Sequence, residues 1–405
     1  MKRLKILLTL LFFSFRLFAQ VELRKNIIPL NLEDGKISTA QLQPMVNDMS
    51  MYKIVGLGEG THGTKEFNEL RIGIIKELIE KKGFRIICFE NAFGDCYYFN
   101  QWLNSGEPIK EGMKKYLISL WQTKELEELF EWIRKFNQDN SGKVTITGMD
   151  FNYLAGTARI IDSETKKLNQ EQLASLSGDL YKDALFCDSV WSNQMKGINR
   201  SDFGARIRSA KSKLLQIDSI LKTNNLQVSN LLQSALLNGK SWNSEESRDR
   251  NMALMAVNLA ENNKMIIWAH AVHLALRPPF KNNNVGGCGG YIKQQVIDYY
   301  SLGTGTANGK YGGTKDRFDT RTNIMDTYRL PPTKRPGWDD YFVQMKTPSF
   351  FIDLRNSKAD TTSLPLRLIG YGPPKRISYS DEVKLSELFD GYIFIKNTSA
   401  PEYLP

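Results

Sequence analysis

The chain has 405 residues and a formal net charge of +10, and 41% of its residues are hydrophobic. This length is enough for one large domain or two ordinary ones. The basic residues form no concentrated stripe, which argues against nucleic-acid binding. Beyond the N-terminus, no stretch of the sequence has the length of a transmembrane helix.

The N-terminus has the pattern of a secretory signal peptide. Residues 1–20 begin with three basic residues, continue with an apolar run at 6–15 and end in a short tail, with cleavage expected near Ala19. The run is shorter than the about 20 apolar residues that span a bilayer. We therefore expect an exported chain of residues 21–405, periplasmic or secreted, with no stable membrane anchor and a net charge of +6. A retained N-terminal anchor is the alternative.

The first structural unit is expected to be strand–helix–strand. Residues 52–58 form an apolar run that ends in glycine, residues 66–83 place apolar side chains three and four positions apart, and residues 84–89 are again apolar. Such a unit is typical of a parallel sheet with a right-handed crossover.

The later elements extend this sheet. The pattern predicts helices at 95–104 and 124–137, a third strand at 143–148, helices through 157–262, a fourth strand at 265–270, and further strands at 299–306, 350–355 and 391–397. We therefore expect a single α/β domain with a mostly parallel central sheet flanked by helices, and a helical insertion between the third and fourth core strands. Glycines between residues 286 and 313 predict a loop-rich face.

The four cysteines leave the disulfide state open. They are Cys88, Cys96, Cys187 and Cys288, and four cysteines in an exported protein allow three pairings. Cys88 lies in an apolar run and is expected to be a buried thiol. Cys288, in the segment GGCGG, is expected to be a loop residue rather than a nucleophile.

All three histidines fall in two short segments. His62 lies in GLGEGTHGTKEF, and His270 and His273 lie in MIIWAHAVHLA. Both segments run from an apolar strand into a polar loop. Because histidine can take and give a proton near neutral pH, this concentration predicts one composite site built from both halves of the chain.

Polar side chains stand where four strands of the expected sheet end. They are Glu59 with His62, then Glu90, then Asp150, then His270 with His273. Ligands bind beyond the carboxyl ends of parallel strands, so the fold should bring these side chains together.

Glu59 and His62 share one turn and suggest a general base. A carboxylate beside a histidine fixes its tautomer and stabilises the imidazolium form. The alternative is a helix cap, in which Thr61 or Thr64 acts with Glu66. That alternative explains the threonines but not the pair of Glu59 and His62.

Three further charged residues have two interpretations each. Arg71 could pair with Glu90 or stabilise an oxyanion, and a purely structural ion pair is as consistent with the pattern. Arg248 and Asp249 could face the site, or Asp249 could serve the N-terminus of the helix that follows.

His270 and His273 could also bind a metal. Two histidines three positions apart, with carboxylates nearby, would suit zinc. The same residues suit a metal-free acid–base pair, and the spacing alone leaves both open.

Taken together, these segments resemble the erythromycin esterase family. The resemblance rests on GEGTHGTKEF, Arg71 and Glu90, RDRNMA, WAHAVHL, GGYIKQ, YYSLGT and FFIDLR, and it runs from about residue 50 to residue 400. It implies a hydrolase with a central sheet, in which His62 is the base that activates water and no covalent intermediate forms. It also implies that Glu59, Glu90, Arg71 and His270 line the same cleft. Some members open the lactone of macrolides, which would connect the chain to antibiotic resistance.

The expected protein is therefore a cofactor-free, metal-independent hydrolase of a small carboxylic ester or lactone. Catalysis is assigned to His62, Glu59, Glu90, Arg71 and His270, with Arg71 or His270 stabilising the oxyanion. The absence of a Gly-x-Ser-x-Gly segment agrees with a water nucleophile. Substrate binding is assigned to His273, Asp150, Arg248 and Tyr291. A zinc hydrolase and a non-catalytic protein that binds carbohydrate or envelope components in the same cleft are the alternatives.

Overall fold

The computed structural model describes residues 27–242, 244–282, 285–355 and 362–405. The expected signal peptide at residues 1–20 lies outside this part of the chain. None of the helices in the described ranges is long and apolar enough to cross a membrane.

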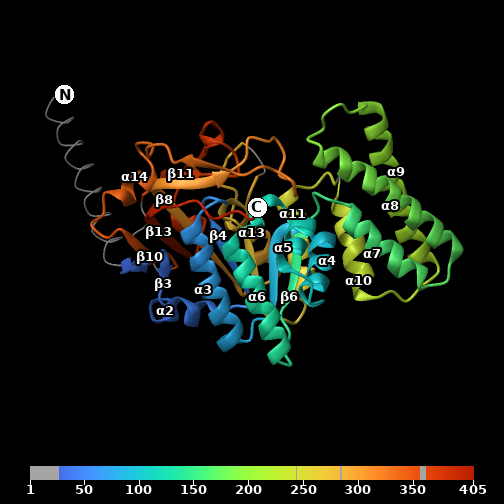
Figure 1. Ribbon diagram of the computed structural model, residues 1–405, viewed down its shortest axis with the longest axis horizontal. Helices are drawn as coiled ribbons and strands as arrows, with labels where there is room; N and C mark the ends of the chain where they lie inside the picture. The colour runs from blue at the N-terminus through green and yellow to red at the C-terminus, as the bar shows by residue number, and fades with distance from the viewer. Residues whose placement is uncertain (1–26, 243, 283–284, 356–361) are drawn as a thin grey trace.

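Within the described residues, a nine-stranded sheet forms the centre of the fold (Figure 1). Its strand order is β1-β10-β13-β8-β4-β7-β5-β6, and β9 pairs with β8. In this spatial order, neighbouring strands from β13 through β6 pair in parallel. At the other edge, β1 pairs antiparallel with β10, and β10 pairs antiparallel with β13. The strand bounds are β1 (Ile27–Pro29), β4 (Ile54–Glu59), β5 (Ile86–Ala92), β6 (Thr145–Asp150), β7 (Met265–His270), β8 (Tyr299–Gly313), β9 (Asp326–Arg329), β10 (Ser349–Asp353) and β13 (Gly391–Thr398). The expected α/β fold with a mostly parallel sheet is confirmed.

Helices cover both faces of this sheet, because successive strand side chains point to opposite faces. On one face, Ile266 and Trp268 of β7 share an apolar cluster with helices α2, α3, α5 and α6. On the other face, Met265 and Ile267 share a cluster with α7 to α11 and α13. The bounds are α2 (Thr39–Met49), α3 (Lys65–Lys82), α4 (Phe93–Leu103), α5 (Ile109–Tyr116), α6 (Lys124–Asp139), α12 (Ala271–Leu274) and α13 (Cys288–Gln295).

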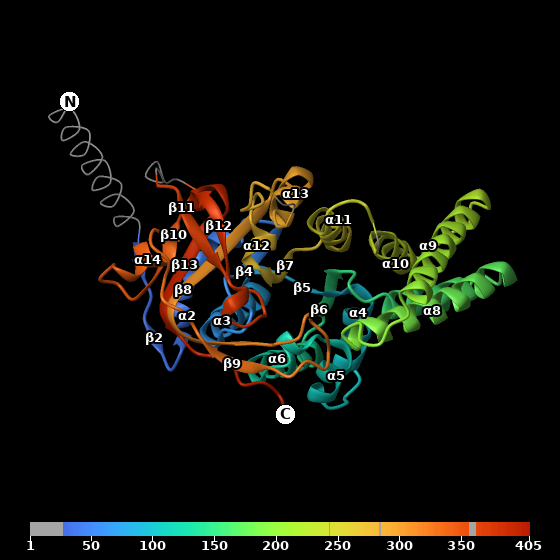
Figure 2. The same ribbon diagram turned by 90° about the horizontal axis from the view of Figure 1, so that it is seen from above.

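The segment between β6 and β7 is helical, as expected for residues 157–262. It comprises α7 (Ala155–Lys166), α8 (Glu171–Ser192), α9 (Arg200–Thr223), α10 (Asn230–Ser241) and α11 (Arg248–Ala260). Figure 2 shows α8 and α9 extending away from the sheet as an arm, whereas α11 lies close to it. We refer to α7–α10 as the helical insertion.

Smaller elements complete the fold. Two antiparallel pairs, β2 (Leu32–Glu33) with β3 (Lys36–Ile37) and β11 (Leu364–Leu368) with β12 (Ser378–Val383), stand apart from the central sheet. The remaining elements are α14 (Trp338–Val343) and the short 3-10 helices η1 (Ser119–Trp121), η2 (Pro374–Arg376) and η3 (Leu385–Glu387).

Two local expectations were wrong. The glycine-rich stretch after residue 302 belongs to the long strand β8 rather than to loops. A Cβ atom on Gly303 would lie only 2.6 Å from the Phe389 ring, so glycine lets that ring pack directly on the strand. Cys288 is also not a loop residue, since it begins α13 and is buried. All four cysteines are free thiols.

Candidate active site

The carboxyl ends of β4, β7, β5 and β6 meet around one cavity. Glu59 at the end of β4 stands opposite His270 at the end of β7 in the parallel register. The cavity has a volume of about 670 Å³, and its polar wall includes His62, Glu90, Asp150, Arg248, His270, His273, Asp319 and Arg376. The sequence prediction that strand-end residues meet at one edge therefore matches the arrangement in the structure.

A tight backbone crossing holds the turn that carries His62. The neighbours of His62 form single β-bridges, Thr61 with Ile369 and Gly63 with Gly312. A Cβ on Gly63 would lie 2.1 Å from the Gly312 carbonyl oxygen, so only glycine permits this approach. The turn is thereby fixed with His62 at the cavity wall. The helix-cap alternative fails at Thr64, whose side chain makes no cap hydrogen bond.

His62 is paired with a buried carboxylate. Its Nδ1 lies 2.8 Å from Glu59 Oε1, and Glu59 has no exposed surface. Burial lowers the pKa of His62, but the hydrogen bond to Glu59 and its charge outweigh burial and raise the pKa above its ordinary value. With Nδ1–H directed to Glu59, Nε2 is the nitrogen left to accept a proton.

Arg71 lies behind Glu59 and not at the cavity. Its guanidinium donates to Glu59 Oε2 at 2.5 Å and to Asn68 Oδ1 at 2.8 Å, and it stacks over the Trp268 ring at 4.0 Å. Its exposed fraction is 0%. The expected pairing of Arg71 with Glu90 is therefore wrong. Arg71 cannot reach an oxyanion, and it holds the Glu59 carboxylate in place for His62.

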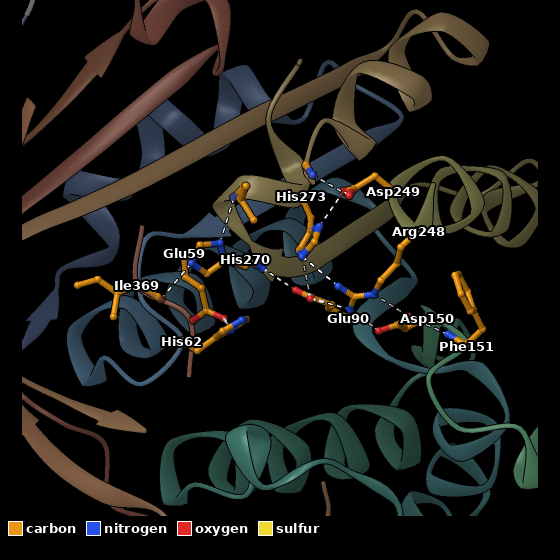
Figure 3. Close-up of polar contacts among 12 residues, drawn as sticks. Glu59, His62, Glu90, Asp150, Phe151, Arg248, Asp249, His270, His273 and Ile369 are labelled. Atoms are coloured by element: carbon orange, nitrogen blue, oxygen red, sulfur yellow. Dashed lines mark hydrogen bonds and ion pairs between the residues drawn. The ribbon is translucent and has the colours of Figure 1, made fainter. Parts of the chain in front are cut away.

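Glu90 instead anchors the opposite side of the cavity (Figure 3). Its Oε1 receives Arg248 Nη2 at 2.9 Å and lies 3.2 Å from His273 Nε2, and its Oε2 accepts the His270 backbone N–H at 2.9 Å. Burial raises the pKa of Glu90, but the charges of His273 and Arg248 outweigh burial and hold the pKa well below its usual range. Glu90 is therefore a carboxylate that connects the ends of β5 and β7 with α11 and α12.

His273 is held as an imidazolium between two carboxylates. Its Nδ1 lies 2.7 Å from Asp249 Oδ1, and its Nε2 faces Glu90 (Figure 3). Burial lowers the pKa of His273, but Glu90 and Asp249 outweigh burial and raise it to about 10. Asp249 also accepts the Gly286 N–H at 2.7 Å, so it supports His273 without lining the cavity, and the cap of α11 is Ser247.

His270 is neutral and has no free nitrogen. Its Nδ1 accepts the Val272 N–H at 3.2 Å, and its Nε2–H donates to the Ile369 carbonyl at 3.1 Å. Burial, followed by the charges of His62 and His273, lowers the pKa of His270 to about 3. Its ring centroid lies 4.8 Å from that of His62. The expected role of His270 as an oxyanion donor does not fit this geometry, and a wall for the His62 ring does.

Arg248 reaches the cavity beside the histidines, and Arg376 is a second cation among the lining residues. The Arg248 side chain is 40% exposed and donates to Asp150 at 3.2 and 2.5 Å in addition to Glu90. Its Nη1 lies 3.2 Å from His273 Nε2. A protonated His273 offers no lone pair there, so Nη1 keeps its hydrogens for another acceptor.

The histidine donors do not fit a zinc site. Zinc needs a free lone pair on each histidine that binds it. Both ring nitrogens of His270 are hydrogen-bonded to the backbone. Both ring nitrogens of His273 face carboxylates. Within the described ranges, no three His, Cys, Asp or Glu side chains are grouped so that they could hold a metal ion.

Besides Arg71, sequence reasoning misplaced Tyr291, and it missed other residues of the site. Tyr291 lies on α13, packs against the apolar cluster beneath the sheet and does not line the cavity. Asp319 does line it, from a loop whose sequence carries no strand or glycine pattern. The sequence also did not predict the apolar wall. Trp191, Phe203 and Ile207 reach the cavity from α8 and α9.

Comparisons with known proteins indicate a family for this chain. A family model described as erythromycin esterase matches residues 79–398. Erythromycin esterase type II of Escherichia coli is 23% identical over 413 aligned positions, which cover 93% of this chain and 96% of that protein. These matches support a hydrolase that acts on a small molecule.

Solved structures show the same fold. The crystal structure of a succinoglycan biosynthesis protein has a TM-score of 0.77 at 19% identity, covering 95% of this chain and 97% of its own. A variant of an erythromycin esterase in its open conformation has a TM-score of 0.68 at 17% identity, covering 91% and 96%.

Proposed function

Since this chain belongs to the erythromycin esterase family, we propose that it hydrolyses a carboxylic ester or lactone with a water molecule that His62 activates. The observation that carries this proposal is the buried pair of His62 and Glu59 at 2.8 Å, with His62 on the wall of the cavity. No covalent enzyme intermediate is required.

The first step is proton transfer from water to His62. Nε2 takes the proton while the hydroxide oxygen bonds to the acyl carbon, and Nδ1–H stays directed to Glu59. The Glu59 carboxylate stabilises the imidazolium that forms, and Arg71 prevents Glu59 from taking the proton itself. The tetrahedral adduct then expels the alcohol, which requires one proton in return.

Arg248 is the group we assign to the developing oxyanion. Its Nη2 and Nε are fixed by Glu90 and Asp150, so Nη1 is held in place at the cavity before substrate arrives. A donor fixed in advance stabilises charge without reorganisation in the transition state. His273, as a cation behind Arg248, keeps Glu90 in position.

The cavity favours a bulky substrate with a large apolar surface. Its volume of about 670 Å³ lies in the range of drug-sized ligand sites. The apolar part of the wall comes from η1 and from the insertion, with the side chains of Leu120, Trp121, Trp191, Phe203 and Trp242. A macrolide lactone fits this description, and so does a large hydrophobic ester.

A panel of substrates tests the proposal. Purified protein would be assayed on aryl esters, alkyl esters, simple lactones and macrolides, with and without EDTA. We expect turnover that survives EDTA and falls by about 10²–10⁴-fold in His62→Asn. Tyr291→Phe, outside the cavity, is the matched control and should be unchanged. Absence of turnover across the panel, or full activity in His62→Asn, would refute the proposal, and binding without turnover would favour a non-catalytic protein.

We also propose that the protein acts outside the cytoplasm, on the charge and apolar pattern of residues 1–20. Cell fractionation followed by N-terminal sequencing tests this directly. The expected product begins near residue 21, and an intact cytoplasmic chain would contradict it.

A further inference from the structure

A carboxyl group that the proposed steps do not use lies on the cavity wall. Asp319 lines the cavity together with His62, Glu90, Asp150 and Arg248. Its Oδ1 is buried and has no hydrogen-bond partner among the described residues. A buried polar atom without a partner is costly and rare in folded proteins. Asp319 is therefore placed at a stability cost, as is common for groups that act on a ligand.

The segment around Asp319 is held firmly, so the unpartnered oxygen does not result from a loose loop. On one side, Gln194 of the insertion makes two hydrogen bonds with the Phe318 backbone, each 2.9 Å long. On the other side, the backbone N–H and the hydroxyl of Ser119 donate to the Thr320 carbonyl at 2.8 and 2.9 Å.

An ion pair fixes the same segment two residues further on. Arg321 donates to Asp95 at 2.5 Å and stacks over the Tyr153 ring at 4.4 Å. Three separate parts of the fold therefore hold the backbone that carries Asp319, and the carboxyl group is directed by them rather than by contacts of its own.

The surroundings favour the protonated form of this carboxyl group. Burial raises the pKa of Asp319, and the nearby carboxylates of Glu90 and Asp150 act in the same direction, whereas His62 and Arg248 oppose them; the pKa lies at about 8. At neutral pH, Asp319 can thus present an O–H to a ligand in the cavity that His62 also lines.

We infer that Asp319 is the general acid that protonates the departing alcohol. This inference rests on the proposed function and assigns the second proton transfer of the same reaction. As the tetrahedral adduct collapses, the bond between the acyl carbon and the alcohol oxygen breaks. The proton on Asp319 passes to that oxygen and leaves a carboxylate. The proton that His62 took from water then returns through solvent to Asp319, so water and ester become acid and alcohol with no other reactant.

The dependence on the leaving group tests this inference. An alkoxide needs a proton to leave, whereas p-nitrophenolate leaves readily without one. In Asp319→Asn we expect kcat/KM for an alkyl ester to fall by about 10²-fold. For the p-nitrophenyl ester of the same carboxylic acid, kcat/KM should stay within about 3-fold of the native value. Departure of p-nitrophenolate gains little from a general acid.

The controls separate this inference from the proposed function. Asp316→Asn removes a carboxylate from the same loop that does not line the cavity, and it should leave both substrates unaffected. Equal losses for both esters in Asp319→Asn would show that Asp319 only orients His62 and would overturn the inference. Equal retention for both esters would overturn it as well. In either case the proposed function stands as long as the native protein turns over the p-nitrophenyl ester and His62→Asn does not.

Discussion

Removing the charge of Glu90 should destabilise the protein strongly, because two cations depend on it. In Glu90→Gln the side-chain shape is kept, but Arg248 and His273 lose a shared carboxylate. Their nitrogens Nη1 and Nε2 lie 3.2 Å apart. Two like charges at this distance repel by about 5 kcal/mol at an effective dielectric constant of about 20. Solvent reduces this figure, because the Arg248 side chain is 40% exposed.

A second estimate comes from His273. The rise of its pKa from 6.5 to about 10 corresponds to a preference for the charged form of about 5 kcal/mol, which Glu90 and Asp249 share. Losing one of the two carboxylates should therefore remove about 2–3 kcal/mol. Together with the lost attraction between Glu90 and Arg248, which no longer offsets the repulsion between Arg248 and His273, we expect a loss of about 3–5 kcal/mol in the free energy of unfolding, as for other broken buried pairs.

Urea unfolding followed by circular dichroism measures this loss, and its pH dependence identifies the cause. The pKa of folded His273 is raised, so its contribution is complete below pH 6.5 and disappears as the pH rises toward 10. The difference between native and variant protein should therefore be largest near pH 6 and smaller near pH 10. Glu246→Gln is the control, since its exposed pair with Arg250 should contribute less than about 1 kcal/mol. A loss below about 1 kcal/mol in Glu90→Gln, or one independent of pH, would refute the reasoning.

Two further variants probe the base and the apolar wall. Glu59→Gln removes the charge that raises the pKa of His62. The acid limb of the pH–rate profile should therefore move to lower pH, and kcat should fall by about 10²-fold or more. An acid limb that does not move would show that Glu59 does not act on the base. Phe203→Ala opens the wall contributed by α9; KM for a macrolide or other bulky ester should rise about 10-fold with little change for an acetate ester. Leu215→Ala, on the exposed side of the same helix at 55% exposure, is the control, and equal effects on large and small esters would contradict the assignment.

The residues at the strand ends of the site could be predicted from the sequence because their pattern is local. An apolar run followed by a polar residue predicts both a buried strand and the chemistry at its end. Glu59, His62, Glu90 and His270 were found in this way, and the parallel sheet does place them together. The helical periodicity of residues 157–262 likewise predicted the insertion between β6 and β7.

Other parts of the site depend on packing that no local pattern encodes. Arg71 pairs with Glu59 rather than Glu90 because α3 packs over the strand that carries Trp268. The hydrogen bond that occupies Nε2 of His270 is made with a carbonyl 99 residues further along the chain. Asp319 sits in an irregular loop positioned by Gln194 and Ser119, which are remote in sequence.

The order of strands has a consequence for how the protein folds. The central strand β4 lies between β7 and β8, so Ile54 pairs with both Met265 and Tyr299. Contacts this distant in sequence close late, because the chain between them must first lose its conformational freedom. A ribosome that has made His62 must add about 200 more residues before the neighbouring strand exists. The cavity should therefore be among the last parts of the molecule to form, and an incomplete chain should have none of its chemistry.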